Sequence, residues 1–168
     1  MRHPTCERKK VSAIYCDRRQ LAFCMAVVII EGFSQQPIFA GERHDVVIYG
    51  ATSSGIAAAV QTTRMQKSVI ILEPGNHLGG LTTGGLGWTD SGNKAVIGGI
   101  ARQFYQHVKK YYDQPAAWKY EKASEYGRYR PDDDAMWTFE PHVAETVFRK
   151  MLAEHGIPIV FGQRLDRG

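Results

Sequence analysis

The sequence predicts an α/β fold in which helices alternate with the strands of a parallel sheet. Two β-branched runs, at 44–49 and 68–72, flank a stretch rich in small residues at 56–66 that reads as a helix. A further helix and strand are expected at 141–155 and 157–161. The 168 residues, of which 43% are hydrophobic and 23% charged, are enough for one sizeable core.

Residues 1–40 are predicted to be an export signal or hydrophobic leader. A basic stretch comes first, and ten apolar residues follow at 21–30. This run is shorter than the roughly 20 apolar residues of a membrane span, but it suits an export signal. The pair Arg18-Arg19 resembles a twin-arginine signal. We expect an exported or periplasmic protein with no stable transmembrane span. The alternative is a misassigned start codon, which would leave the protein cytoplasmic.

The excess of basic residues lies in the first half of that leader. Its first 20 residues hold six basic and two acidic side chains, which accounts for the whole net charge of +4. A nucleic-acid partner is therefore not expected. All three cysteines also lie in the leader, so residues 41–168 have no disulfide framework, and no metal site is predicted there.

The predicted domain at 41–168 opens with a strand, a glycine turn and a helix. Gly50 lets the chain turn sharply out of the strand, and Gly55 removes a side chain where the helix must approach the sheet. Free N–H groups at the helix N-terminus suit a pyrophosphate. The whole turn is a candidate binding loop, made of Gly50, Ala51, Thr52, Ser53, Ser54 and Gly55.

An acidic residue completes this pattern. Glu73 ends the second strand 23 positions after Gly50, close to the roughly 20 residues of a dinucleotide fold. Its carboxylate can accept hydrogen bonds from both ribose hydroxyls and would repel a 2′-phosphate. The middle glycine of G-x-G-x-x-G is replaced by Thr52. Its side chain leaves less room for a phosphate to approach the backbone. We expect a Rossmann-like βαβ domain that binds an adenine dinucleotide.

Two other interpretations of the same turn remain open. Residues 51–55 form a degenerate nucleophile elbow, which would make Ser53 the nucleophile of a serine hydrolase. Ala51 stands where that elbow needs its first glycine, and Glu73 would have no role. In the other interpretation, the segment is an ordinary βαβ unit, and its glycines serve only the turn and bind no nucleotide.

A glycine-rich stretch at 74–87 favours FAD over a nicotinamide cofactor. Eleven of the 17 glycines fall between residues 50 and 99. A flavin domain presses a bare backbone loop along the pyrophosphate, where side chains would obstruct the approach. That loop is expected to begin at the glycine doublet, with candidate cofactor contacts at Gly79, Gly80, Leu81 and Thr82.

The segment HDVVIYGATSSGIAAAVQTTRMQKSVIILEPGNHLGGLTTGGLG resembles the amino-terminal part of FAD-dependent oxidoreductases of the glutathione-reductase-like superfamily. It is most similar to a bacterial, often exported group, some of whose members are labelled xanthan lyase-like. The likeness continues through Trp88-Thr89-Asp90, 97–105 and 139–145.

That resemblance implies roles for individual residues. Gly50 and Gly55 would hold the FAD pyrophosphate, Glu73 the adenosine ribose, and Gly79 with Gly80 would line the cofactor. Thr52 and Ser54 depart from the family pattern. The resemblance names no catalytic residue and leaves the small-molecule substrate unidentified.

The remaining residues predict a helical and aromatic insertion at about 88–139. Its helix, at 95–112, would bury one face, made of Val96, Ile100, Phe104 and Val108. The many aromatic residues after it are expected to pack as core, with a sugar-stacking platform as the alternative. Arg102 and His107 are expected to be solvated.

The third strand, at 157–161, is followed by only seven residues. Since flavin oxidoreductases of this type are several times longer, we expect a sheet incomplete at the C-terminus and an N-terminal fragment that holds the ADP part of FAD. Such a fragment need not be active alone. The alternative is a non-catalytic nucleotide-binding remnant or subunit, whose fold a partner chain completes.

Overall fold

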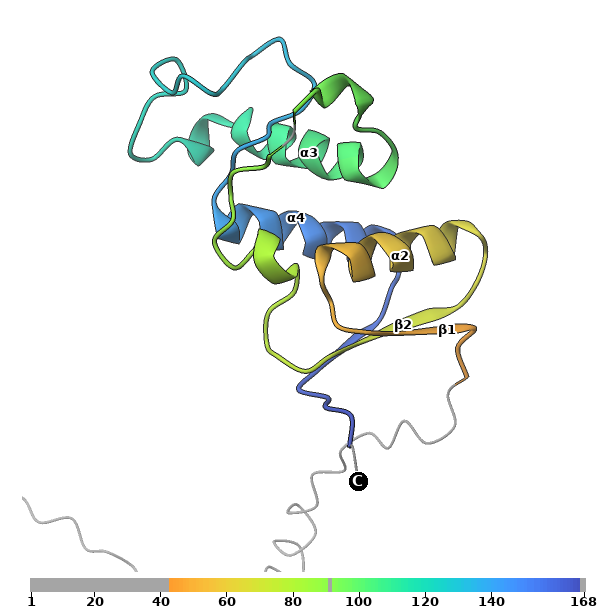
Figure 1. The fold of residues 1–168 in the computed structure, drawn as a ribbon. Coiled ribbons are helices and arrows are strands. Elements are labelled where there is room, and N and C mark those ends of the chain that lie inside the picture. The colour runs from red at the N-terminus through yellow and green to blue at the C-terminus, as the bar shows by residue number, and fades with distance from the viewer. Residues whose placement is uncertain (1–42, 91, 167–168) are drawn as a thin grey trace, which may run out of the picture. The chain divides into compact units, whose positions relative to one another are not determined.

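The computed structural model describes residues 43–90 and 92–166 (Figure 1). The predicted export signal, its twin-arginine pair and the three cysteines lie outside the described residues. Within the described part, no helix is long and apolar enough to cross a membrane.

Three parallel strands form the sheet, in the order β1-β2-β3. They are β1 (Val46–Tyr49), β2 (Val69–Glu73) and β3 (Ile159–Phe161). Helices α2 (Ser53–Arg64) and α4 (Pro141–Glu154) lie over the same face of the sheet in Figure 1. The predicted α/β fold with a Rossmann-like parallel sheet is therefore confirmed, including its third strand.

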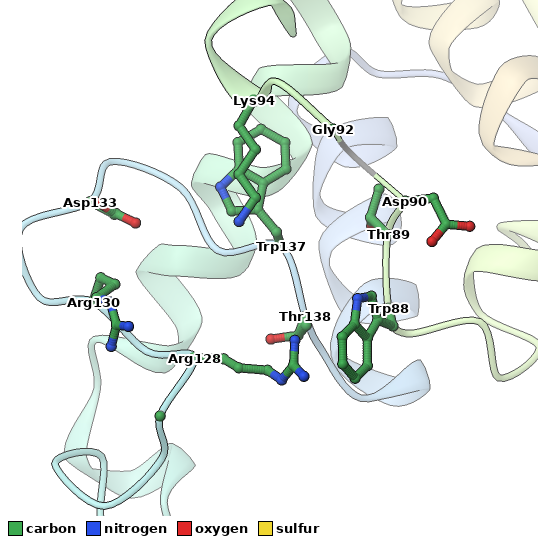
Figure 2. A pocket seen from close by; sticks show the side chains of 11 residues that line it. Trp88, Thr89, Asp90, Gly92, Lys94, Arg128, Arg130, Asp133, Trp137 and Thr138 are labelled. Atoms are coloured by element: carbon green, nitrogen blue, oxygen red, sulfur yellow. The ribbon is translucent and has the colours of Figure 1, made fainter.

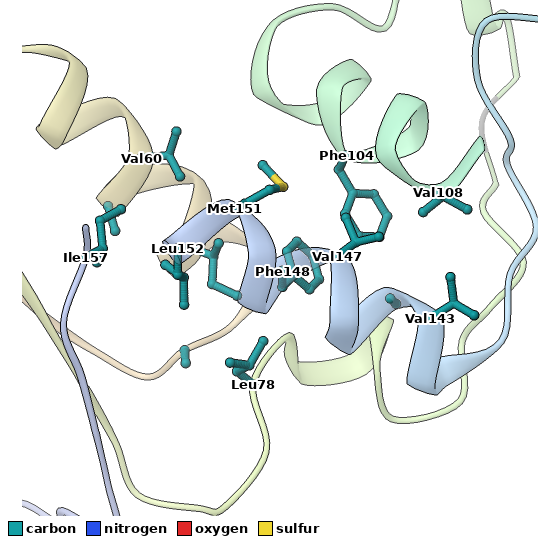
Figure 3. Close-up of a cluster of buried hydrophobic side chains, with 14 of the residues drawn as sticks. Val60, Leu78, Phe104, Val108, Val143, Val147, Phe148, Met151, Leu152 and Ile157 are labelled. Carbon is teal, nitrogen blue, oxygen red and sulfur yellow. The ribbon is translucent and has the colours of Figure 1, made fainter. Parts of the chain in front are cut away.

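Helix α4 supplies the centre of the core (Figure 3). It begins with Pro141, which suits the first turn, and Gly156 follows its end with a φ of +61°. The stacked rings of Phe104 and Phe148, 4.4 Å apart, join α4 to α3 (Gly99–Tyr112). The predicted apolar face of α4 is confirmed, because all its members are buried: Val143, Ala144, Val147, Phe148, Met151 and Leu152.

Helix α3 begins later than its hydrophobic spacing predicts. A short 3-10 turn (Lys94–Val96) comes first, and Val96 is 78% exposed, so its predicted place on the buried face is wrong. The cause lies in two glycines: Gly98 is extended, and Gly99 has a φ of +58°. These conformations interrupt the helical path, and the apolar face starts only after them.

Strand β1 is covered on one face only. We expected a strand buried on both faces, yet Val47 and Tyr49 are 58% and 47% exposed. Val46 and Ile48 pack against the core on the side of the helices. Among the described residues, β1 pairs with β2 alone, so its second edge is open.

The aromatic residues of the insertion pack together, as the core interpretation predicts. The Trp118 ring lies against Tyr126 and Tyr129, and its Nε1 donates to the Tyr112 carbonyl oxygen at 2.7 Å. Tyr120 is the exception among the described aromatic residues that follow α3, since it is 98% exposed. These contacts fasten the long connection between α3 and α4 onto the end of α3.

A buried amine anchors the same connection. Lys109 is 5% exposed, and its Nζ donates to the Asp113 carboxylate and, at 3.2 Å, to the Pro131 carbonyl oxygen. Tyr129 donates to the same carboxylate at 2.8 Å. Burial lowers the pKa of Lys109, but the Asp113 carboxylate outweighs it, and the pKa is raised.

His107 differs from its predicted solvated state. The ring is half-buried, and the Nδ1 atom is buried with no hydrogen-bond partner among the described residues. Burial lowers its pKa below the usual 6.5; Glu154 opposes this shift, while Lys110 and Lys150 reinforce it. The folded state therefore resists protonation, and stability is lost as the pH falls below the unfolded value of about 6.5.

We expect His107→Leu to reduce the loss of thermal stability between pH 7.5 and pH 5.5. Leucine fills the site, and unlike the imidazole it has no group whose protonation favours the unfolded state. Melting temperatures of both proteins, followed by circular dichroism at the two pH values, measure the effect. An identical pH dependence in the variant would contradict the assignment.

Candidate functional site

The loop between β1 and α2 has the two glycines that its geometry requires. Gly50 has a φ of +97°, which favours glycine. A Cβ atom on Gly55 would lie 2.4 Å from the Gly50 carbonyl oxygen and 3.2 Å from Ile48 Cγ2. Their predicted turn and packing roles are thus confirmed. Helix α2 begins at Ser53, three residues earlier than expected, so Ser53, Ser54 and Gly55 form its first turn.

Thr52 is the N-cap of α2. Its Oγ1 accepts a hydrogen bond from the Gly55 N–H at 3.1 Å and pairs with Ser54 Oγ at 3.0 Å. Its φ of −69° suits any residue, so the backbone has no need of the glycine that the fingerprint has here. Among the described residues, the Ser53 and Ser54 N–H groups have no partner, and the first turn has no acidic residue. This end of α2 can therefore receive an anion.

The glycine doublet lies against this loop. Gly79 donates its N–H to the Ala51 carbonyl oxygen at 2.6 Å, and a Cβ atom on Gly80 would lie 3.5 Å from Thr52 Cβ. Gly79 and Gly80 have φ values of +97° and +56°. A Cβ atom on Gly79 would also lie 2.3 Å from Thr83 Cγ2, so that position has no room for a larger residue.

Two hydroxyls join the loops a second time. Ser53 Oγ donates to the Gly79 carbonyl oxygen at 3.2 Å and pairs with Thr82 Oγ1 at 2.8 Å. Thr82 ends the short 3-10 turn Gly80–Thr82, in which Leu81 is 75% exposed. The structure thus brings both predicted loops together at the N-terminus of α2.

Glu73 connects β2 to the first loop. Its Oε2 accepts a hydrogen bond from the Ala51 N–H at 2.6 Å, and its Oε1 accepts one from the Gly75 N–H at 2.7 Å. An ionised carboxylate has about four acceptor positions, so each oxygen keeps one for a ligand. The side chain is half-buried, and the carboxylate lies beside the backbone that would carry the phosphates.

The geometry does not support the hydrolase interpretation. A serine nucleophile needs a general base within hydrogen-bond reach. The hydrogen-bond partners of Ser53 Oγ are Thr82 and a carbonyl oxygen, and within residues 43–90 and 92–166 no histidine or carboxylate contacts it. The described part of the chain also holds no group of three or more potential metal ligands.

The fold places the chain in the class of α/β proteins with a Rossmann-like parallel sheet. A family model described as FAD dependent oxidoreductase matches residues 45–167. The chain belongs to this family of FAD-dependent oxidoreductases. A comparison with curated proteins finds no match.

Two solved structures are distantly similar. One is THI4 of Thermovibrio ammonificans, with 14% identity and a TM-score of 0.42 over 88% of this chain and 47% of that one. The other is 3-ketosteroid-Δ4-(5α)-dehydrogenase of Rhodococcus jostii RHA1, with 14% identity and a TM-score of 0.39 over 72% and 38%. The chain thus spans less than half the length of either structure.

We expect Gly55→Ala to lower the free energy of unfolding by about 1–3 kcal/mol, because the new methyl group would collide with backbone that cannot easily move. Urea unfolding measures the change. Gly127→Ala is the matched control, since a Cβ atom there meets nothing within 4 Å. Equal stability of the two variants would show that α2 does not need its close approach to β1.

Proposed function

We propose that this chain binds FAD and holds its ADP half for a flavin-dependent oxidoreductase. The observation that carries the proposal is the position of Glu73. Its carboxylate accepts hydrogen bonds from the Ala51 and Gly75 N–H groups, and each of its oxygens keeps a free acceptor position. A ribose with two hydroxyl donors is the ligand that this arrangement suits.

The backbone next to the proposed ribose position has free N–H groups that would suit a pyrophosphate. The N–H groups of Ser53 and Ser54 and the positive end of the α2 dipole would bind its oxygens. Gly79 and Gly80 present bare backbone close by, where a dinucleotide could lie against the loop. Thr82 and the exposed Leu81 continue this surface and are proposed as further contacts.

The chemistry of the reaction would come from the bound FAD, which exchanges hydride with a substrate. The residues of this chain would bind and orient it. Within the family, we propose the narrower kinship to the glutathione-reductase-like, often exported proteins that the sequence motifs indicate.

A second candidate is a nucleotide-binding subunit without redox activity. Thr52 favours it, because its Oγ1 already occupies the Gly55 N–H that a phosphate could use, and its side chain stands beside Gly80. The visible absorption spectrum of the purified chain separates the two candidates. Flavin bands support the oxidoreductase, whereas binding of ADP without any flavin supports the subunit.

Glu73→Gln should weaken ADP binding about tenfold, because a charge-assisted hydrogen bond to the ribose is lost. Calorimetric titration with ADP and 2′-deoxy-ADP tests the role directly. The original protein should prefer ADP, and the variant should lose that preference. Glu154→Gln, an exposed change on α4, is the control. A variant that still discriminates between the two nucleotides would remove Glu73 from the ribose site.

Thr52→Gly should tighten FAD binding about three- to tenfold. It frees the Gly55 N–H for a phosphate oxygen, while glycine as N-cap costs only a few tenths of a kcal/mol. Fluorescence titration of FAD measures the affinity. Weaker binding in the variant would show instead that the Thr52 hydroxyl itself contacts the phosphate.

A further inference from the structure

A pocket apart from the proposed FAD site is built from residues that this site does not use. It has a volume of about 780 Å³ (Figure 2). One wall comes from residues 88–90 and 92–94, and the other from residues 127–138, at the end of the connection between α3 and α4. Its lining combines cationic, aromatic and acidic side chains, mainly Trp88, Lys94, Arg128, Arg130, Asp133 and Trp137.

Backbone pairing holds the two walls of this pocket together. Trp88 and Thr138 form an antiparallel bridge, the Phe139 N–H donates to the Gly87 carbonyl oxygen at 2.9 Å, and the Thr89 N–H donates to the Trp137 carbonyl oxygen at 3.3 Å. A Cβ atom on Gly87 would lie 2.0 Å from the Phe139 carbonyl oxygen. The glycine is therefore needed for the two walls to come this close.

The two tryptophans of the pocket differ in their surroundings. Trp137 is buried, and its ring lies 4.4 Å from that of Tyr105, whose hydroxyl donates to Thr89 at 3.1 Å. Trp88 is 62% exposed, although its backbone is held by the bridge. An indole that projects from a paired backbone and is left open to a pocket is a surface on which a flat or ring-shaped ligand can pack.

Arg128 lies directly on Trp88. Its Cζ atom is 3.2 Å from the centre of the indole ring, and Figure 2 shows the side chain reaching across the pocket toward it. Stacking uses the flat face of a guanidinium and leaves the N–H donors at its edge free. Those donors match the two oxygens of a carboxylate.

The charges of the pocket favour an anion. Three cationic side chains line it against two acidic ones, Asp90 and Asp133. Lys94 lies over the Trp137 ring at 5.6 Å, and within the described residues neither Lys94 nor Arg128 forms an ion pair with a carboxylate. Arg102 behaves differently, because Asp134 binds its guanidinium with both carboxylate oxygens.

We propose that this pocket binds a small organic acid in which a carboxylate is attached to a ring. The carboxylate would bind the edge of Arg128 in the positive field of Lys94, and the ring would pack on the exposed part of Trp88. A neighbouring pocket of about 480 Å³ shares Trp88, Arg128 and Thr138 and continues toward Trp118. The ligand body can extend in that direction.

Calorimetric titration of the whole chain with two carboxylates tests this site. Glucuronate carries its carboxylate on a sugar ring and benzoate on an aromatic ring; glucose and benzyl alcohol are their neutral counterparts. At least one acid should bind, at least tenfold more tightly than its counterpart. Which acid binds identifies the ring. The titration needs no flavin, so its result is independent of the FAD site.

Arg128→Gln should weaken binding of that acid about 10- to 100-fold, and Trp88→Ala about tenfold. Arg164→Gln, which removes an exposed arginine outside the pocket, should change it less than twofold. Circular dichroism of each variant verifies that it is folded.

Three outcomes would overturn the proposal. Failure of both acids to bind at about 10 mM would exclude the site for this class of ligand. If glucose or benzyl alcohol bound as tightly as the corresponding acid, the carboxylate charge would have no role in binding. Inorganic phosphate binding as tightly as the acids, with no effect of Trp88→Ala, would show a site for a bare anion.

Discussion

The candidate site depends on one steric constraint, the close approach of α2 to the end of β1. The backbone at Gly55 lies so near the Gly50 carbonyl oxygen that a side chain atom would be only 2.4 Å from it. Because the helix starts against the strand, its N-terminus lies directly after the turn at Gly50–Thr52. The pairing of Tyr49 with Leu72 at the ends of β1 and β2 then puts the Ala51 nitrogen 2.6 Å from Glu73 Oε2. Phosphate and ribose groups of one ligand could then be bound together.

Thr52 shows how this loop departs from the glycine fingerprint without losing its shape. The middle glycine of the fingerprint serves the approach of a ligand rather than the backbone conformation. The φ of −69° allows a threonine, which caps the helix and pairs with Ser54. The substitution stabilises the helix start and at the same time uses one N–H group that a pyrophosphate could bind. Stability and ligand binding therefore compete at this position.

The insertion has one buried and one open aromatic region. Around Tyr112 and Trp118 the rings pack on one another and form core. At Trp88 the ring is exposed, with a guanidinium as its neighbour. Composition alone could not distinguish the two regions, because the same residue types serve both. The structure distinguishes them: the backbone bridge to Thr138 holds Trp88 at the pocket, where its ring is exposed, while the Trp137 ring is buried.

The sequence by itself determined the features that depend on neighbours in the chain. Strand, turn and helix around Gly50, the acidic end of β2 and the apolar face of α4 follow from spacing and local conformation, and the structure confirms them. The tertiary structure decided what depends on distant residues: the exposure of Val47 on a sheet covered on one face, the link from Ser53 to Thr82, and the contact of Arg128 with Trp88. Periodicity reports which residues share a face. It carries no information about what lies opposite that face, since this depends on how segments 29 or 40 residues apart fold back on each other.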